Sequence, residues 1–235
     1  MEARFAVTSR RPFIIAHRGF SAEYPENTLV AVRAALNLGV DYVEIDVQET
    51  ADGKLAVFHD YRLDRICWVT GRVRDTTFAG LRRLNPTIPS LAEVLRVCRG
   101  KARVLIEIKG ADPRKVAAEI ERHGMEREVI VFSLSMSHLQ VLAAANPRIA
   151  RFGLVARDLT TNIASLKSSV TVEGLGVSRR LVTSPEIVDM VHRHGWQLFV
   201  WTVNRKAEMQ QLASWGVDGL ITNHPDRANS WLARP

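Results

Sequence analysis

Strand and helix patterns alternate along almost the whole chain, with a period of about 25 to 30 residues. Short β-branched runs such as 13–16, 42–47 and 103–108 are each followed by apolar residues at helical spacing. Because about eight such units follow one another without a long linker, the strands are expected to be parallel and covered by helices. We therefore predict a closed (β/α)8 TIM barrel in a single domain over 1–235, with a doubly wound open sheet as the alternative.

Apolar periodicity and capping residues place the individual elements. Strands are predicted at 13–16, 42–47, 54–58, 103–108, 128–132, 149–155, 172–177, 196–202 and 218–222. Helices are predicted from the Asn27-Thr28 cap to Gly39 and at 76–84, 90–98, 113–123, 136–145, 161–168, 184–194, 205–214 and 225–233. Ser90 and Glu93 have the spacing of a capping box, and Asp52-Gly53 is typical of a hairpin tip. Periodicity is poor between about 60 and 88, so this segment is predicted to be an excursion over the mouth of the barrel.

The strand predicted at 42–47 carries two carboxylates, Glu44 and Asp46, in an apolar run. Successive strand residues point to opposite faces, so the two acids share one face and lie roughly 7 Å apart along it. Buried there without a counter-ion, they would repel each other and lose hydration, at a cost of several kcal/mol. A solvated edge strand would explain such a pair alone; in this context we predict a divalent metal site.

A second charged pair, Glu107 and Lys109, shares one face of the strand at 103–108 by the same argument. A simple ion pair within the strand explains it equally well. Joined to Glu44 and Asp46, however, Glu107 completes a set of three carboxylates. An all-oxygen donor set suits Mg²⁺ or Ca²⁺ better than Zn²⁺. Lys109 is then predicted to contact phosphate.

Two histidines, His17 and His59, each stand directly after an apolar strand. Barrel enzymes hold their reactive groups at such strand ends. A lone histidine is most often structural, but two of them beside an acidic pair can supply a neutral base and a protonated acid near pH 7, as cleavage of a phosphate ester requires. Arg18 adds a fixed cation suited to phosphate oxygens.

Composition limits the remaining classes of function. The formal net charge is +7, but the basic residues are scattered rather than gathered in a block, which is typical of a solvated surface. Cys67 and Cys98 fit neither a disulfide framework nor a zinc site, which predicts a reducing compartment. No run of about 18 apolar residues is present, and 1–11 lack an apolar leader core. We therefore expect a soluble, cytoplasmic protein without stable membrane insertion.

Seven short motifs, in order along the chain, connect these residues to a known family. They are His17-Arg18-Gly19, Pro25-Glu26-Asn27-Thr28, Glu44-Ile45-Asp46-Val47, His59-Asp60, Glu107-Ile108-Lys109, Trp201-Thr202-Val203-Asn204 and Gly216-Val217-Asp218-Gly219. From about residue 13 to residue 226 the chain resembles the glycerophosphodiester phosphodiesterase family. The resemblance implies a barrel enzyme of lipid and glycerol metabolism that uses a divalent cation to hydrolyse glycerophosphodiesters to an alcohol and sn-glycerol 3-phosphate.

The resemblance also implies roles for the site residues. The acid/base histidines of the family match His17 and His59. Its metal ligands match Glu44, Asp46 and Glu107. Its phosphate contacts match Arg18 and Lys109. Trp201 matches an aromatic residue at the pocket wall near the glycerol, with core filling as the alternative. Glu26 and Asn27 match a motif near the site, and helix capping by Asn27 explains that residue equally well.

The sequence departs from the family pattern at two places. Arg65 is followed by Ile66-Cys67-Trp68, where an Arg-Thr pair and a glycine-rich turn are frequent, and this leaves the identity of the leaving alcohol open. Asn223 follows Thr222 where an aspartate is common, which leaves the polar contact after the last strand open.

Two other functions fit part of the pattern. A phosphodiesterase resembling lysophospholipase D or sphingomyelinase D would favour a larger apolar mouth, and often secretion with disulfides. A catalytically silent barrel that binds phosphoesters is the alternative of a different class, and the complete set of histidines and acids speaks against it. We expect a small-molecule glycerophosphodiester substrate and no nucleic-acid partner; the sequence does not indicate an oligomeric state.

Overall fold

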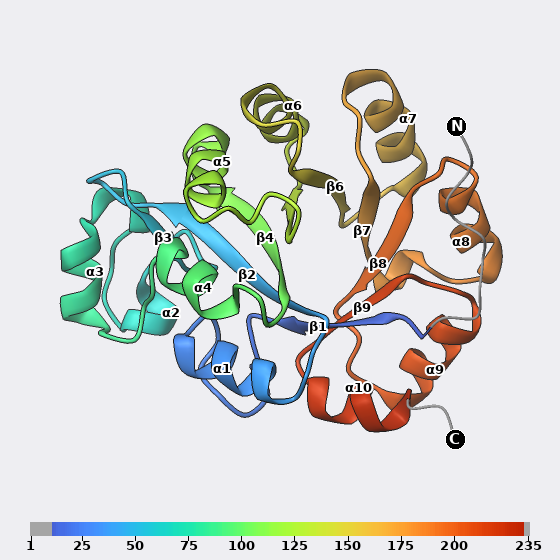
Figure 1. Ribbon diagram of the computed structural model, residues 1–235, viewed down its shortest axis with the longest axis horizontal. Coiled ribbons are helices and arrows are strands. Elements are labelled where there is room, and N and C mark those ends of the chain that lie inside the picture. Colours follow the sequence, from blue (N-terminus) through green and yellow to red (C-terminus); the bar gives the residue numbers. More distant parts are fainter. Residues whose placement is uncertain (1–10, 233–235) are drawn as a thin grey trace.

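Eight parallel strands close into a barrel in the computed structural model, which describes residues 11–232 apart from the side chains of residues 162, 165, 167 and 168. The strands run in the ring order β1-β9-β8-β7-β6-β5-β4-β2, and β1 pairs with β2 to close it (Figure 1). This closure confirms the barrel and excludes the open sheet. The strands are β1 (Phe13–His17), β2 (Tyr42–Glu49), β4 (Arg103–Gly110), β5 (Val129–Ser133), β6 (Ala150–Val155), β7 (Gly174–Ser178), β8 (Gln197–Trp201) and β9 (Gly219–Thr222).

A helix lies between successive strands on the outside of the ring, and a last one follows β9 (Figure 1). Local capping fixes several helix starts: the Thr28 hydroxyl accepts from the Ala31 N–H, and Ser90 and Glu93 make both bonds of the predicted capping box. The helices are α1 (Leu29–Asn37), α4 (Leu91–Cys98), α5 (Pro113–Arg122), α6 (Met136–Ala145), α7 (Leu159–Ser169), α8 (Pro185–His192), α9 (Lys206–Ser214) and α10 (Pro225–Trp231), with a 3₁₀ turn, η2 (Arg179–Leu181), after β7.

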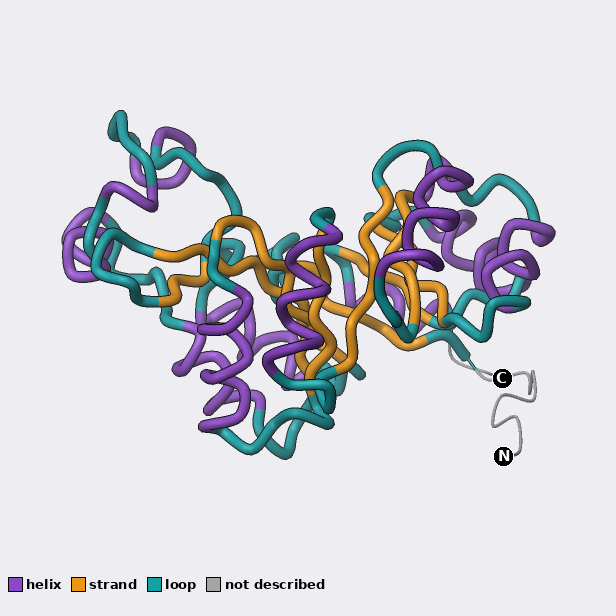
Figure 2. Tube along the Cα trace, turned by 90° about the horizontal axis from the view of Figure 1, so that it is seen from above, coloured by secondary structure: helices purple, strands orange, loops and turns teal. Residues whose placement is uncertain are grey.

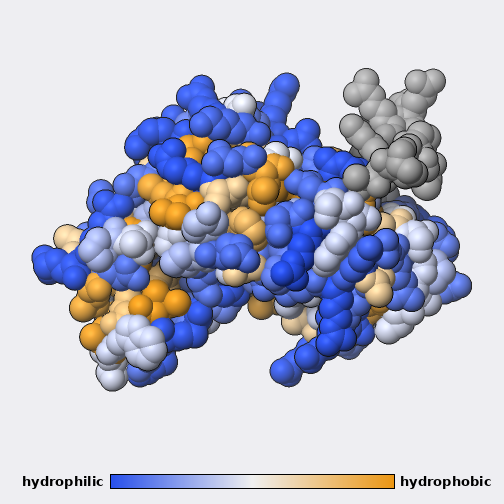
Figure 3. Space-filling view, turned by 90° about the horizontal axis from the view of Figure 1, so that it is seen from below, coloured by the Kyte–Doolittle hydropathy of each residue, from blue (hydrophilic) through white to orange (hydrophobic). Residues whose placement is uncertain are grey.

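The chain leaves the ring between β2 and α4, as predicted for the segment from about 60 to 88. First, β3 (Leu55–Val57) pairs antiparallel with the outer end of β2 and lies outside the ring. Then α2 (Asp64–Cys67), η1 (Val73–Asp75) and α3 (Phe78–Leu84) pack on a small apolar core of their own. Figure 2 shows this excursion at the left, and in Figure 3 a notch at the lower edge lies between the lobe at the left and the part of the molecule to its right.

An aromatic layer fills the inside of the barrel. Phe132, Phe152 and Phe199 are buried and their rings contact one another, with Tyr42 against Phe199. Gly174 makes room for this layer, because a Cβ there would lie 2.5 Å from the Phe152 ring. The packed interior leaves the C-terminal ends of the strands as the place for polar side chains.

Two expectations lie partly outside the described residues. Residues 1–10, which we expect to lack a leader core, and residue 233, the predicted end of the last helix, are among those the structure does not describe. Within 11–232, no helix combines the length and the apolar character needed to cross a bilayer. The single domain expected over 1–235 stays a prediction.

Candidate active site

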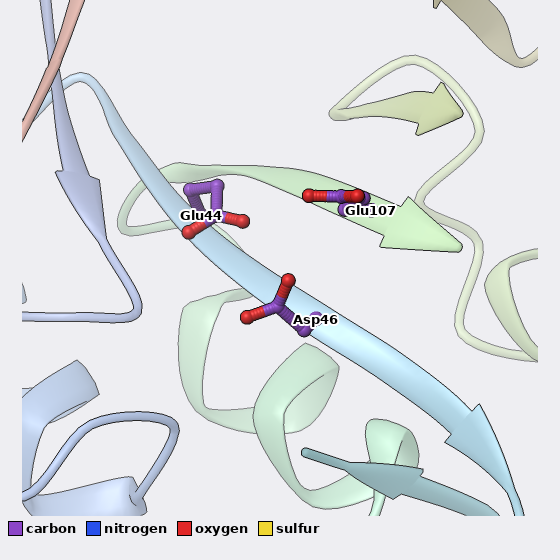
Figure 4. A group of neighbouring side chains, drawn as sticks. All are labelled: Glu44, Asp46 and Glu107. Atoms are coloured by element: carbon purple, nitrogen blue, oxygen red, sulfur yellow. The ribbon is translucent and has the colours of Figure 1, made fainter. Parts of the chain in front are cut away.

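Three carboxylates from the neighbouring strands β2 and β4 come together, with Glu44 in register with His17 at the end of β1 (Figure 4). Alternation along β2 puts Glu44 and Asp46 on one face, and the register of the parallel pair sets Asp46 beside Glu107. One oxygen of each acid lies within 4.8 Å of the others. Glu44 is 4% exposed and Asp46 is 1% exposed, so little water reaches these two carboxylates.

Burial and mutual repulsion dominate the electrostatics of this acidic cluster. Burial, with the charge of Asp46 added, raises the pKa of Glu44 well above its ordinary value. The same two causes raise the pKa of Glu107 to about 7. A divalent cation would relieve this repulsion, and oxygen donors alone suit Mg²⁺ or Ca²⁺. The residues present therefore fit the predicted metal site.

Two cations border the acidic cluster, as the sequence predicts. Lys109 Nζ lies 2.6 Å from Glu107 Oε1 and 3.6 Å from Asp46 Oδ1. The chain turns out of β1 through Arg18, whose left-handed backbone (φ +57°) is uncommon outside glycine. The Arg18 N–H donates to Glu44 Oε2 at 2.8 Å, and its Nε lies 3.2 Å from Asp46 Oδ2. Both side chains are mostly buried beside the carboxylates, where they can contact phosphate oxygens bound there.

His17, at the end of β1, is held by a neutral partner. Its Nδ1 lies 2.6 Å from Asn223 Oδ1, which also accepts from the Ser21 hydroxyl at 3.1 Å. Since a carbonyl oxygen can only accept, the proton of the neutral ring sits on Nδ1, and Nε2 keeps a free lone pair. Burial, followed by the charge of Arg18, lowers the pKa of His17 to about 4. This contact gives Asn223 a role that the sequence left open.

His59 comes from the excursion rather than from a strand of the ring. It follows β3, and its Nδ1 lies 2.6 Å from Asp60 Oδ1. Gln48, the next inward position of β2 after Asp46, donates from Nε2 to the backbone carbonyls of Phe58 (3.3 Å), His59 (3.1 Å) and Asp60. Gln48 therefore holds the loop that carries His59. Gln48 was not predicted from the sequence, although continuing the period of two along β2 by one step would have found it.

A chain of ion pairs joins the His59 loop to the carboxylate cluster. Asp60 accepts from Arg65 Nε at 2.6 Å, and both terminal nitrogens of Arg65 donate to Glu26, at 2.7 and 2.9 Å. Glu26 in turn accepts from Arg18 at 2.8 Å. Burial alone would raise the pKa of Glu26, but the hydrogen bonds from Arg65 and Arg18 lower it to about 2. Arg65 thus fastens the excursion to the site, a link that no motif in the sequence revealed.

Asn27 does not cap α1, so helix capping was the wrong explanation for it. The helix cap is Thr28. Asn27 is buried, and its Nδ2 donates to Asp46 Oδ2 at 2.9 Å while its Oδ1 accepts from the Asp46 N–H at 3.2 Å. This pair of bonds fixes the orientation of the Asp46 carboxylate.

Trp201 lies on the other side of the mouth. It ends β8, which is four steps from β4 in either direction around the ring. The side chain packs against the aromatic layer, and its buried Nε1 has no hydrogen-bond partner among the described residues. The structure thus keeps Trp201 apart from the acidic cluster but leaves it a free donor.

Comparisons with known proteins agree with this geometry. The model of the "Glycerophosphoryl diester phosphodiesterase family" matches residues 17–227. A glycerophosphodiester phosphodiesterase of Bacillus altitudinis is 33% identical over 240 residues, which cover 92% of this chain and 96% of the relative. The crystal structure of a glycerophosphodiester phosphodiesterase from Agrobacterium tumefaciens is 30% identical, with a TM-score of 0.80 over 93% of this chain and 99% of that one. An Oleispira antarctica phosphodiesterase at 24% identity shares the fold, with a TM-score of 0.83 over 94% of this chain and 96% of that one.

Proposed function

Since the chain belongs to the glycerophosphoryl diester phosphodiesterase family, a family of phosphoric diester hydrolases, we propose that it hydrolyses glycerophosphodiesters to an alcohol and sn-glycerol 3-phosphate. One observation carries the proposal. Three carboxylates, two of them buried, meet beside two cations, Arg18 and Lys109, at the mouth of a barrel that also presents two histidines. Such a site can bind a phosphodiester and move protons at it.

A divalent cation, Mg²⁺ or Ca²⁺, belongs to this proposal. Glu44, Asp46 and Glu107 would hold it, with Asn27 keeping Asp46 in position. When bound, the cation stabilises negative charge that develops on the phosphoryl oxygens. Arg18 and Lys109 balance charge on the same oxygens from the protein side.

Proton transfer falls to the two histidines. His17, with a free lone pair on Nε2, takes the proton from the glycerol hydroxyl next to the phosphorylated carbon. The oxygen of that hydroxyl attacks phosphorus within the same molecule, with the entropic advantage of an intramolecular reaction, and the bond to the leaving alcohol breaks. His59, oriented by Asp60, gives a proton to the departing oxygen. Water then opens the five-membered cyclic phosphate, with the roles of the two histidines exchanged.

The proposal is tested with a coupled assay for glycerol 3-phosphate over a panel of glycerophosphodiesters, with and without chelator. We expect turnover of at least one diester and its loss in excess chelator. No glycerol 3-phosphate from any diester would contradict the function. A substrate whose glycerol lacks the neighbouring hydroxyl tests the mechanism: if it is cleaved as fast as the natural diester, direct attack by water replaces the cyclic route. The cytoplasmic location and the contact of Trp201 with the glycerol stay predictions.

A further inference from the structure

A cavity of about 660 Å³ extends outward from one side of the candidate site. His59, Glu107 and Lys109 line its inner end. From there it runs past the excursion to the loop between β5 and α6, where Leu134 lies. Trp201 is not among its lining residues, because β8 stands across the ring. The cavity is thus continuous with the reacting groups on the side where His59 lies.

Carbon forms much of the outer wall of this cavity. Leu134 is 60% exposed and Tyr61 is 61% exposed, and both line it. The Tyr61 hydroxyl donates to the Lys109 carbonyl at 3.0 Å, which fixes the ring over the cavity. His138 lines the same wall, and burial lowers its pKa, so this ring favours the neutral form. An apolar group that enters the cavity therefore contacts uncharged side chains along this wall.

The acids of the cavity wall already have basic partners. Asp60 pairs with Arg65, Asp64 with Arg62, and Glu107 with Lys109. Among the residues that line the cavity, all of which the structure describes, no carboxylate is left to receive a ligand cation. If Glu107 and Asp46 hold a divalent cation, Lys109 shares both of its carboxylate partners with that cation, and the wall gains net positive charge. A cationic ligand would then lose hydration without an opposite charge to replace it.

We propose that this cavity binds the leaving alcohol and selects uncharged alcohols with an apolar body over cationic ones of the choline type. The inference rests on the proposed function, since it assigns the alcohol to the side where His59 protonates the departing oxygen. Tyr61 alone can attract a cation through its ring, by roughly 0.5–1 kcal/mol at an exposed position. The neighbouring guanidinium and ammonium groups oppose that attraction.

Two substrates of nearly equal shape test the selection. Glycerophosphocholine carries a quaternary nitrogen, and the 3,3-dimethylbutyl ester of glycerol 3-phosphate has a carbon in its place. We expect the wild-type protein to show a kcat/KM for the neutral ester that is higher by about fourfold or more, the scale of one desolvated methylene. Leu134→Asp should lower this ratio by about threefold or more, because it places an unpaired carboxylate in the wall.

Two control variants separate charge from polarity and from distant effects. Leu134→Asn matches aspartate in size without its charge and should move the ratio less than Leu134→Asp. Leu84→Asp adds the same charge at an exposed leucine (43%) on α3 that does not line the cavity, and should leave the ratio unchanged. Preference for the choline ester in the wild-type protein, or a ratio that Leu134→Asp does not move, would overturn the inference alone. Turnover of another glycerophosphodiester but of neither ester would also overturn the inference alone, whereas no glycerol 3-phosphate from any diester would overturn the proposed function as well.

Discussion

Each end of strand β9 supplies the partner of one histidine, and the two pairs differ in charge. At the C-terminal end, Asn223 Oδ1 lies 2.6 Å from His17 Nδ1. At the N-terminal end, Asp218 Oδ2 lies 2.9 Å from His192 Nε2. Burial and a nearby cation lower the pKa of His17 to about 4, whereas the hydrogen bond to Asp218 raises the pKa of His192. Similar contacts thus favour the neutral form of one histidine, as a base requires, and the charged form of the other.

The same contrast extends to the carboxylates at the two ends of the barrel. At the C-terminal mouth, the three carboxylates Glu44, Asp46 and Glu107 lie close together beside only two contacting cations among the described residues, Arg18 and Lys109. At the N-terminal face, Asp218 accepts from His192 and from the Leu198 N–H at 2.7 Å, so its charge is used inside the fold. The carboxylates at the mouth therefore repel one another, and a bound cation would relieve this repulsion. The charged groups at the opposite face form stabilising pairs.

Glu44→Gln at the mouth and Asp218→Asn at the N-terminal face should differ most in their effects on activity and stability. For Glu44→Gln we expect turnover to fall by more than about 10²-fold, since ligand loss should exceed the 10- to 100-fold typical of residues that only support a ligand. Without metal, the same variant should unfold at higher temperature, because one repelling charge is gone. Asp218→Asn, the matched carboxylate-to-amide change at the other end, should do the reverse: activity retained and stability lowered. Turnover and thermal unfolding in chelator measure both, and full activity of Glu44→Gln would contradict the metal site.

Replacing the histidines one at a time tests the contrast at the level of proton transfer. His17→Ala and His59→Ala should each lower kcat by roughly 10²- to 10⁴-fold with a small effect on KM, as expected for loss of a general acid or base. His192→Ala should leave kcat within about twofold, since it lies at the other end of the barrel, away from the reacting atoms. Steady-state kinetics decide the matter. A His17 or His59 variant that kept more than a tenth of wild-type kcat would argue against the assignment.

Sequence patterns predicted the parts of the site that depend on one strand or on neighbouring strands. The period of two along β2 placed Glu44 and Asp46 on one face, and the parallel partner β4 then had to bring Glu107 close. Helix α2 was missed because its four residues have no periodicity to detect. The choice between Asn27 and Thr28 as cap could not be made, since both residue types cap helices well.

Contacts between segments far apart in the chain could not be predicted from the sequence. Asn223 stands 206 positions from His17, and only the pairing of β1 with β9 brings them together. The bond from Arg65 to Glu26 joins the excursion to the loop after β1, and no local pattern specifies where an excursion folds back.

Asn223→Asp should make the pair of His17 with residue 223 resemble the pair of His192 with Asp218. An ionised acceptor beside His17 favours the imidazolium and raises the pKa of His17. Because a general base must be neutral, the acidic limb of the kcat/KM profile should move to higher pH, with roughly tenfold lower activity on that limb for each pKa unit. Asn223→Ala is the control: it frees the ring and should lower kcat at every pH. A limb that stays in place or moves to lower pH in Asn223→Asp would contradict the role of Asn223.

The smallest expected effect is the pH dependence of the free energy of unfolding that the His192–Asp218 pair provides. The pKa of His192 in the folded protein is raised above the ordinary value of 6.5, so the folded state binds the proton more tightly than the unfolded state. The stabilisation is therefore fully present below pH 6.5 and is lost as pH rises through the raised pKa. With side chains 26% and 28% exposed, the pair should contribute roughly 0.5–1 kcal/mol, because solvent screens such ion pairs.

A double-mutant cycle of His192→Gln and Asp218→Asn, measured by urea unfolding at about pH 5.5 and about pH 9, isolates this coupling from the separate bond of Asp218 to the Leu198 N–H. We expect a coupling energy at the lower pH that shrinks toward zero at the higher one. An equal coupling at both values, or a larger one at high pH, would show that the pair does not depend on the charged imidazole, and the contrast between the two ends of β9 would fail.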